Sequence, residues 1–256
     1  MKIASWNVNS LKVRLPQVLD WVDHQRPEVL GLQETKLTDE KFPLEAFREL
    51  GYQVSFSGQP TYNGVALISV DAQADPVSAI PDFDDTQKRV IAATINGVRV
   101  INLYVVNGQE VGSEKFAYKL AWLAAVTRWV EQERTRHERL VVMGDFNIAP
   151  DDRDVYDPAA WREKILCSTP EREALQQMLD LGLHDSFRLF DQPESVYSWW
   201  DYRAAMFRRG LGLRIDLVLC SDELREACAT SYVDKEPRRL ERPSDHAPAI
   251  AEFNLG

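Results

Sequence analysis

The sequence has few cysteines and no long apolar segment. Its 256 residues include three cysteines, Cys167, Cys220 and Cys228, none of them in a CxxC pair. We therefore expect buried reduced thiols and no disulfide framework. No segment approaches the roughly 18 to 20 apolar residues that cross a bilayer, and "MKIASWNVNS" at the N-terminus lacks the apolar region of a signal peptide. We expect a cytoplasmic monomer with no membrane partner and no obligate protein partner.

Positive charge is also in short supply. The chain has 30 Lys and Arg residues against 40 Asp and Glu residues, a net charge of −10. A protein that coats nucleic acid is normally basic, so the net charge argues against that class. A nuclease is not excluded, because a local patch and a metal ion can bind the phosphate. Residues 202–215 supply such a patch, since they include Arg203, Arg208, Arg209 and Arg214 and no acid.

Apolar segments of strand length recur along the whole chain, without a linker, a low-complexity segment or a short repeat. Hydrophobic residues make up 45% of the sequence, enough for a packed core. The segments typical of strands are residues 2–6, 29–33, 52–56, 65–70, 90–95, 98–104, 140–143, 214–220 and 249–253. The pair Asn96-Gly97 between two of them predicts a hairpin with a type I′ turn.

Helical patterns fill the gaps between these strands. Pro16 is expected in the first turn of one helix. An apolar stripe marks a second helix through Phe116, Leu120, Leu123 and Val130, and a third through Leu175, Met178, Leu179 and Leu183. We predict one α+β domain over residues 1–256, with two mostly antiparallel sheets packed face to face and flanked by helices.

Polar side chains stand at the ends of the apolar segments. In "LVVMGDFNIAP", Asp145 and Asn147 follow four apolar residues, and an extended chain would point both to the same side. Turn chemistry before Pro150 would explain one such pair. The same pattern recurs in other segments, at Asn7 and Asn9, Gln33 and Glu34, Asp216, and Asp245 with His246. A buried charge is costly unless it is paired or bound to a metal, so we predict that these segments meet in one site.

The residue types in this set indicate metal-assisted chemistry. Oxygen ligands dominate, with a single histidine and no cysteine, which suits Mg²⁺ or Mn²⁺ better than zinc. A hard cation beside an aspartate and a histidine is typical of phosphate-ester cleavage. No GxSxG nucleophile motif and no P-loop is present, so water is the expected nucleophile.

Five segments, in order, resemble the exonuclease III family of DNA-repair enzymes, within the endonuclease/exonuclease/phosphatase superfamily. They are "WNVNSL", "LQETK", "GDFNIAP", "GLRIDLVL" and "RPSDHAP", and the match extends from Met1 to about Phe253. The resemblance implies a four-layer αββα sandwich and dependence on Mg²⁺, with Mn²⁺ able to substitute. It also implies that the substrate is double-stranded DNA, cleaved 5′ to abasic sites or trimmed of blocking groups and nucleotides at nicks and 3′ ends.

The resemblance assigns the metal ligands. Glu34 of "LQE" would be the main ligand, helped by Asn7 and Asp245. One or two metals are compatible with such a site. The ligands of a second metal would be Asp145, Asn147 and His246.

It also assigns catalytic roles. Asp145 would orient or deprotonate the attacking water, and Asn147 would hold a phosphate oxygen. His246 would hydrogen-bond the same phosphate, with Asp216 fixing its tautomer. Asp216 as a plain cross-strand ion pair is the alternative. Tyr104 would reach the phosphate or the leaving oxygen, unless it only packs in the core.

The aromatic segment "YSWWDYRAAMFRRGLGLR", residues 197–214, is the candidate DNA-binding loop. Its aromatic side chains and arginines could wedge into a groove of DNA. We expect Trp199, Arg208 and Arg209 to contact the substrate, together with Asn107 on the DNA backbone. The alternative is that Trp199 belongs to the edge of the core. The segment "KEPRRLERP", residues 235–243, is mixed in charge and is predicted to be a surface loop.

Three functions fit these residues. The first is a DNA-repair phosphodiesterase. The second is a superfamily phosphodiesterase or phosphatase that acts on a phospholipid or an inositol phosphate, which the cationic aromatic loop disfavours. The third is a binding module without catalysis, which the complete set of polar site residues disfavours.

Overall fold

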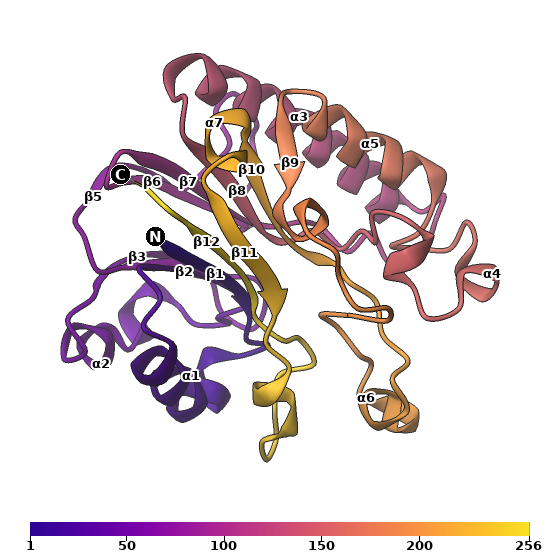
Figure 1. Cartoon of the computed structure of the whole chain (residues 1–256), viewed down its shortest axis with the longest axis horizontal. Coiled ribbons are helices and arrows are strands. Elements are labelled where there is room, and N and C mark those ends of the chain that lie inside the picture. The colour runs from indigo at the N-terminus through magenta and orange to yellow at the C-terminus, as the bar shows by residue number, and fades with distance from the viewer. Residues whose placement is uncertain (256) are drawn as a thin grey trace.

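The computed structural model describes residues 1–255, whose strands form two six-stranded sheets (Figure 1). The first sheet contains, in spatial order, β11 (Cys228–Val233), β12 (Ala249–Phe253), β1 (Lys2–Asn7), β2 (Val29–Gln33), β4 (Val65–Ser69) and β3 (Gln53–Ser57). The second contains β5 (Gln73–Val77), β6 (Val90–Ile95), β7 (Val98–Tyr104), β8 (Leu140–Asp145), β10 (Asp216–Ser221) and β9 (Leu183–Asp185).

Each sheet has one parallel strand pair near its centre. β1 runs parallel to β2 and β7 runs parallel to β8, while the remaining pairings are antiparallel. The first pair is connected through α1 (Leu11–Gln25) and the second through α3 (Glu114–Arg136). Parallel strands present their carboxyl ends at the same edge of a sheet, and it is there that an α/β structure commonly carries its site.

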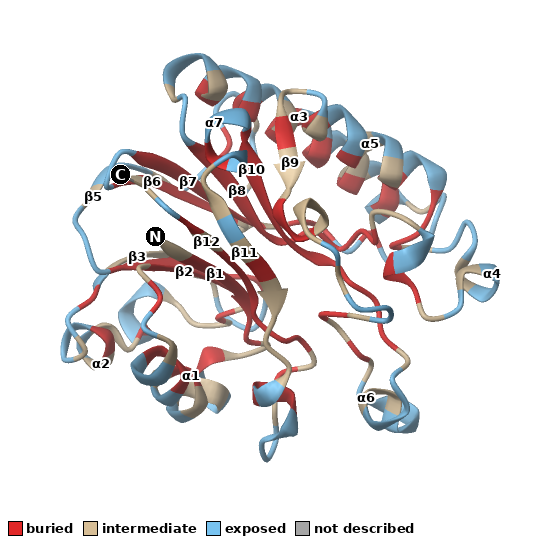
Figure 2. Ribbon diagram, viewed as in Figure 1, coloured by how far each residue is buried: buried red, intermediate tan, exposed pale blue. Residues whose placement is uncertain are grey.

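Helices cover the outer faces of both sheets, so the predicted four-layer αββα sandwich is confirmed. In Figure 1, α1 and α2 (Leu44–Arg48) cover the first sheet, and α3 and α5 (Thr169–Leu179) cover the second. Figure 2 shows the central strands buried and edge strands such as β5 and β11 partly exposed, with the helices buried only on the side that faces a sheet. The shorter helices α4 (Pro158–Trp161), α6 (Met206–Arg209) and α7 (Asp222–Arg225) lie in the loops of the second half of the chain.

Strand alternation separates the apolar side chains into layers. In β8, Val141 and Met143 point between the two sheets, whereas Leu140 and Val142 point toward the helices. The same alternation in β1 places Ile3 between the sheets. The inward positions therefore form a common core that joins the two sheets, and any polar residue at an inward position must lie between them.

All nine predicted strands are present, with ends that differ by at most two residues. Three strands were missed. β5 is a polar edge strand that contains Pro76, β9 has only three residues, and β11 is half-exposed with little apolar character. Each lacks the apolar alternation on which the prediction depends. The prediction of a single domain over residues 1–256 stays a prediction.

The sequence predicts a strand that stops at residue 143, before Gly144, but β8 does not end there. The strand continues to Asp145, and Gly144 lies opposite Leu103 of β7. A Cβ atom at position 144 would lie 1.9 Å from the carbonyl oxygen of Leu103. Glycine is therefore required where the two strands approach each other, and it allows β8 to continue to Asp145.

Two helix predictions need correction, and one turn prediction is confirmed. Pro16 lies inside α1, which begins at Leu11, because the buried Leu11 already starts the helix. Leu183 lies in β9 and not in the helix predicted from Leu175 onward, which is α5 and ends at Leu179. Asn96 and Gly97 have φ values of 48° and 75°, as the type I′ turn between β6 and β7 requires.

The cysteines are free thiols, of which Cys167 and Cys220 are buried and Cys228 is partly buried. No helix among residues 1–255 combines the length and the apolar character needed to cross a membrane.

Candidate active site

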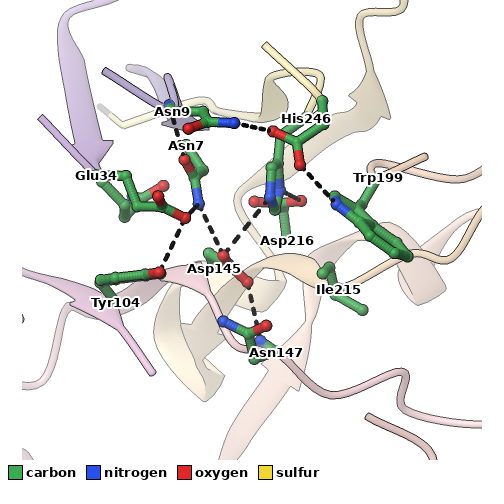
Figure 3. Close-up of polar contacts among 12 residues, drawn as sticks. Asn7, Asn9, Glu34, Tyr104, Asp145, Asn147, Trp199, Ile215, Asp216 and His246 are labelled. Carbon is green, nitrogen blue, oxygen red and sulfur yellow. Dashed lines mark hydrogen bonds and ion pairs between the residues drawn. The ribbon is translucent and has the colours of Figure 1, made fainter. Parts of the chain in front are cut away.

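Polar side chains take the inward positions at one end of the two central strand pairs (Figure 3). Asn7 ends β1, Tyr104 ends β7 and Asp145 ends β8, while Glu34 directly follows β2. Asp216 begins β10, and because β10 is antiparallel to β8 it lies opposite Asp145. Residues that are far apart in the sequence therefore surround one point at the edge of the sandwich.

Glu34, Asp145 and His246 offer ligand atoms that all lie within 4.8 Å of one another. In residues 1–255 this is the one group of three or more such side chains. The amide nitrogen of Asn7 donates to Glu34 Oε1 and to Asp145 Oδ2, both at 2.9 Å, and the Tyr104 hydroxyl donates to Glu34 Oε1 at 2.8 Å. Two converging carboxylates fit a hard divalent cation.

Two of the other predicted metal ligands are oriented differently. The side-chain oxygen of Asn7 accepts a hydrogen bond from the backbone N–H of Asn9 at 2.9 Å, so ligation by Asn7 would require its amide to turn over. Asp245 lies beside the group and not in it. Its carboxylate accepts hydrogen bonds from the Asn9 amide at 2.9 Å and from the Trp199 indole at 3.0 Å. Ligation by Asp245 stays a prediction.

The backbone at the site adopts strained conformations. Asn9, Glu34, Lys36 and Asn147 have φ values of 43°, 52°, 54° and 49°. Such conformations are uncommon for residues other than glycine and persist only where the surrounding structure enforces them. Here they turn the chain sharply after β1, β2 and β8, and so direct the side chains toward a common point.

Glu34 is ionised although it is largely buried. Burial opposes its ionisation, but the Lys36 ammonium at 2.8 Å and the Asn7 amide outweigh burial and lower the pKa of Glu34. A permanently charged carboxylate is what a cation needs as its first ligand.

Asp145 has the opposite tendency. It is 2% exposed, and burial, reinforced by the charge of Asp216, raises its pKa to about 7 although His246 opposes the rise. The backbone N–H of Asn147 donates to Asp145 Oδ1 at 2.9 Å, which leaves Oδ2 facing Asn7 and His246. A carboxylate with a pKa near neutrality can accept and release a proton during a reaction.

His246 is held by a buried chain of hydrogen bonds. Its Nδ1 lies 2.9 Å from Asp216 Oδ2, which also accepts a hydrogen bond from the Ser198 hydroxyl at 2.7 Å. Burial lowers the pKa of His246, but Asp216 and Asp145 outweigh it and raise the pKa to about 10. The imidazole is therefore a cation at neutral pH, with Nε2 only 3.8 Å from Asp145 Oδ2. The partner of Asp216 is this histidine.

Tyr104 and the two asparagines complete the site. The hydroxyl of Tyr104 donates to Glu34, so Tyr104 does more than pack in the core. Burial and the nearby Glu34 raise the pKa of Tyr104 well above its usual value, which keeps the hydroxyl protonated. The Asn107 amide donates to Asn147 Oδ1 at 3.0 Å, and the Asn147 amide donates to the carbonyl of Val105 at 3.0 Å.

The aromatic arm, residues 197–214, is divided between the site and the solvent. Trp199 is half-buried beside Asp245, whereas Arg208 and Arg209 are exposed on α6 at the tip of the arm (Figure 1). Arg214 was predicted to belong to a basic patch, and this is wrong. Its side chain is 1% exposed and forms ion pairs with acids of neighbouring segments. Arg203 pairs with Asp201 at 2.6 Å, so the unpaired part of the patch among residues 1–255 is Arg208 and Arg209.

Two supporting residues escaped the sequence analysis although a signal was present. Lys119 lies three residues after Phe116 on the apolar stripe of α3, and its buried ammonium donates to the carbonyls of Asn147 at 2.7 Å and Asn107 at 3.1 Å. It also pairs with the buried Glu171. The signal in the sequence was a lysine at an apolar position of the helical stripe.

Asn102 is the second such residue, at an inward position of β7. Its amide donates to the carbonyls of Leu32 at 3.0 Å and Ala66 at 2.9 Å, and its oxygen accepts from Gln33 at 2.6 Å. It fits over Gly31, where a Cβ atom would lie 2.8 Å from Asn102 Cγ. These bonds join the two sheets directly behind Glu34 and Tyr104, which fixes the distance across the site.

Comparisons with known proteins agree with this geometry. The sequence profile of the endonuclease/exonuclease/phosphatase family matches residues 4–246. The exodeoxyribonuclease III of Haemophilus influenzae is 38% identical over 266 residues, which cover 99% of this chain and 100% of the relative.

Solved structures are also similar over their full length. A 3′ phosphatase from Neisseria, solved bound to a product DNA hairpin, has a TM-score of 0.98 and 53% identity, covering 100% of both chains. An AP endonuclease from Archaeoglobus fulgidus has a TM-score of 0.95 and 38% identity, also covering 100% of both chains. The chain therefore belongs to the endonuclease/exonuclease/phosphatase family and, within it, to the group of exodeoxyribonuclease III.

Proposed function

We propose that the protein is a metal-dependent DNA-repair phosphodiesterase. It cleaves double-stranded DNA 5′ to abasic sites and removes blocking groups or nucleotides at nicks and 3′ ends. The observation that carries the proposal is the convergence of Glu34, Asp145 and His246, with Asp216 behind the histidine. The names of the relatives, an exodeoxyribonuclease, a 3′ phosphatase and an AP endonuclease, support DNA as the substrate.

Nucleases of this family use divalent metals, and we propose Mg²⁺, for which Mn²⁺ can substitute. Glu34 and Asp145 would hold the ion, helped by Asn7 after rotation of its amide and by Asp245. A bound cation polarises a phosphoryl oxygen and lowers the pKa of water. A second ion, if one is used, would be held by Asp145, Asn147 and His246, and it would require His246 to lose its Nε2 proton.

The chain's own residues supply proton handling and charge. Asp145 orients the attacking water and takes its proton, since its Oδ2 faces the centre of the site. The water oxygen attacks phosphorus and the bond to the leaving oxygen breaks. His246 directs its Nε2–H at the anionic phosphate, and Asp216 holds the tautomer by accepting from Nδ1. Tyr104 and Asn147 donate to the phosphate or to the leaving oxygen.

Substrate binding uses the loops around this centre. Asn107 contacts the DNA backbone, and Trp199 packs against the sugar at the cleavage point. Arg208 and Arg209 contact phosphates further along the duplex, since they are exposed outside the site. The cytoplasmic location, the monomeric state and the lack of an obligate protein partner stay predictions.

The decisive experiment uses purified protein with Mg²⁺ on three duplexes. One has an internal abasic analogue, one a nick with a 3′-phosphate and one a plain recessed 3′ end. We expect cleavage of at least one duplex and none in excess chelator. Vesicles that contain a phosphoinositide test the alternative substrate class, and turnover of these vesicles without turnover of DNA would contradict the proposal.

A further inference from the structure

Arg238 is buried, although it lies in a segment that the sequence predicts to be a surface loop. It belongs to the short 3-10 helix η5 (Glu236–Arg239) and is 7% exposed. Its neighbour Arg239 is exposed and pairs with Glu236 at 3.1 Å. Two adjacent arginines therefore have opposite surroundings, and the prediction of a surface loop is wrong for Arg238.

Aromatic rings surround the buried guanidinium. Its central carbon lies 4.7 Å from the ring centre of Phe207, 5.7 Å from that of Tyr202 and 5.8 Å from that of Trp200. Within residues 1–255, no carboxylate forms an ion pair with Arg238. All three rings belong to the aromatic arm, and such faces attract a desolvated cation. The arm is therefore anchored on a charge that another loop supplies.

The same guanidinium is connected to the backbone of two site residues through Ser244. Its Nη1 donates to the carbonyl of Ser244 at 2.8 Å. The hydroxyl of Ser244 donates to the carbonyl of Asn7 at 2.7 Å and accepts from the backbone N–H of His246 at 3.2 Å. One side chain thus connects the arm to the backbone of two site residues.

We propose that Arg238 is a positioning residue that holds the DNA-binding arm in register with Asn7 and His246. The inference rests on the proposed function, because it takes the arm as the part that binds the duplex. Arg238 is buried and does not contact the reacting atoms. Its loss removes the contact between the tip of the arm and the backbone of the site, while the hydrogen bonds of Trp199 and Trp200 to Asp245 remain. We therefore expect the tip to shift, which changes both duplex affinity and the placement of the His246 ring.

The experiment compares Arg238→Met with Arg239→Met, which removes the adjacent exposed charge. Arg238→Met is expected to weaken binding of a fluorescent duplex in chelator by about tenfold, as loss of a desolvated cation–π contact implies. The ¹⁵N signals of the His246 ring should shift in Arg238→Met only, and the thermal midpoint of each variant is recorded. Arg238→Lys keeps the cation and should recover part of the affinity.

Phe207→Leu removes the contact from the arm's side and serves if Arg238→Met does not fold. It should weaken duplex binding, and combining it with Arg238→Met should add little. Unchanged affinity and unchanged His246 signals in both variants would overturn the inference, as would equal effects of Arg239→Met. Failure of the proposed function appears separately, as wild-type protein that cleaves none of the duplexes, because these readouts need no turnover.

Discussion

Two clusters of buried charge lie on either side of Ile215, and they differ in their balance of charge. In the first, Arg214 pairs with Asp154 at 2.6 Å and with Asp185 at 2.6 Å, and Arg188 also pairs with Asp154. In the second, Asp216 faces His246 near Glu34 and Asp145 (Figure 3). Arg214 and Asp216 are each 1% exposed, and Asp216 begins β10 whereas Arg214 precedes it by two residues.

In the first cluster, which we call the balanced cluster, two arginines pair with two aspartates. Burial opposes the charge of Arg214, but the two aspartates outweigh it and raise the pKa of Arg214 above its usual value. In the other cluster, carboxylates outnumber cations. Burial, reinforced by the charge of Asp216 and opposed by His246, raises the pKa of Asp145 there to about 7. Burial of charge is therefore common to both clusters, and the excess of one sign is what distinguishes the site.

Substitution of Asp145 should have the largest effect. Asp145→Asn is expected to lower kcat by about 10²- to 10⁴-fold, because a general base is lost, while duplex affinity is retained. Its folded pKa of about 7 lies above the unfolded value of 3.8, so stability is lost as pH rises between these two values, and the loss is complete above about 7. Without metal at pH 8, the variant should thus melt at a higher temperature than the wild type. Near wild-type turnover would remove Asp145 from the mechanism.

Substitution in the balanced cluster should lower stability and leave turnover nearly unchanged. Asp154→Asn breaks a buried ion pair and is expected to cost about 3–5 kcal/mol of unfolding free energy, measured by urea titration. Turnover per folded molecule should change little, since Asp154 does not contact the site. The exposed pair of Asp151 and Arg153 provides the control, because Asp151→Asn should cost about 1 kcal/mol or less. Loss of turnover without loss of stability would contradict the comparison.

Glu34→Ala tests the need for a cation at the unbalanced cluster. The metal concentration for half-maximal activity should rise by at least the roughly 10- to 100-fold that follows loss of a residue supporting a metal ligand. Titration with Mg²⁺ at saturating duplex measures it. Glu45→Ala, in an exposed pair with Arg48, should leave the titration unchanged. An unaltered curve for Glu34→Ala would exclude Glu34 as a ligand.

His246 and Asp216 should behave as one unit. His246→Ala and Asp216→Ala should each cost much of the rate, and the double variant little more than the worse single one. The non-additivity expected for residues in contact is about 0.5–3 kcal/mol, obtained from kcat/KM of the four proteins. Fully additive losses would show that the 2.9 Å contact has no catalytic role.

The smallest effect is a displacement of the pH profile. The pKa of His246 is raised from 6.5 to about 10, so the cation is present below that pH and is lost as pH rises through it. Activity that needs the cation should therefore fall near pH 10. Asp216→Asn removes the main cause of the rise and should move this alkaline limb of kcat/KM to lower pH. If the alkaline limb does not move in Asp216→Asn, it reports the titration of a group other than His246.

The candidate site could be predicted from the sequence wherever a local pattern carried the information. Alternation along each strand determined which side chains face inward, so Asp145 and Asp216 were recognised as charges at core positions. The hairpin at Asn96-Gly97 followed from local backbone preference. Strands without apolar alternation, such as β5 and β11, could not be recognised, because their burial depends on neighbours that the pattern does not contain.

The layer architecture and the polar residues at the strand ends were predictable from the sequence, because side-chain periodicity and short motifs are local properties. The partners of each buried charge depend on the folded arrangement and could not be predicted. Arg214 and Asp216 look alike in the sequence, yet one meets balancing acids and the other a histidine and an unbalanced carboxylate. Arg238 and Lys119 likewise depend on segments remote in the chain. The energy of a buried charge is set by its partners, and the fold chooses those partners.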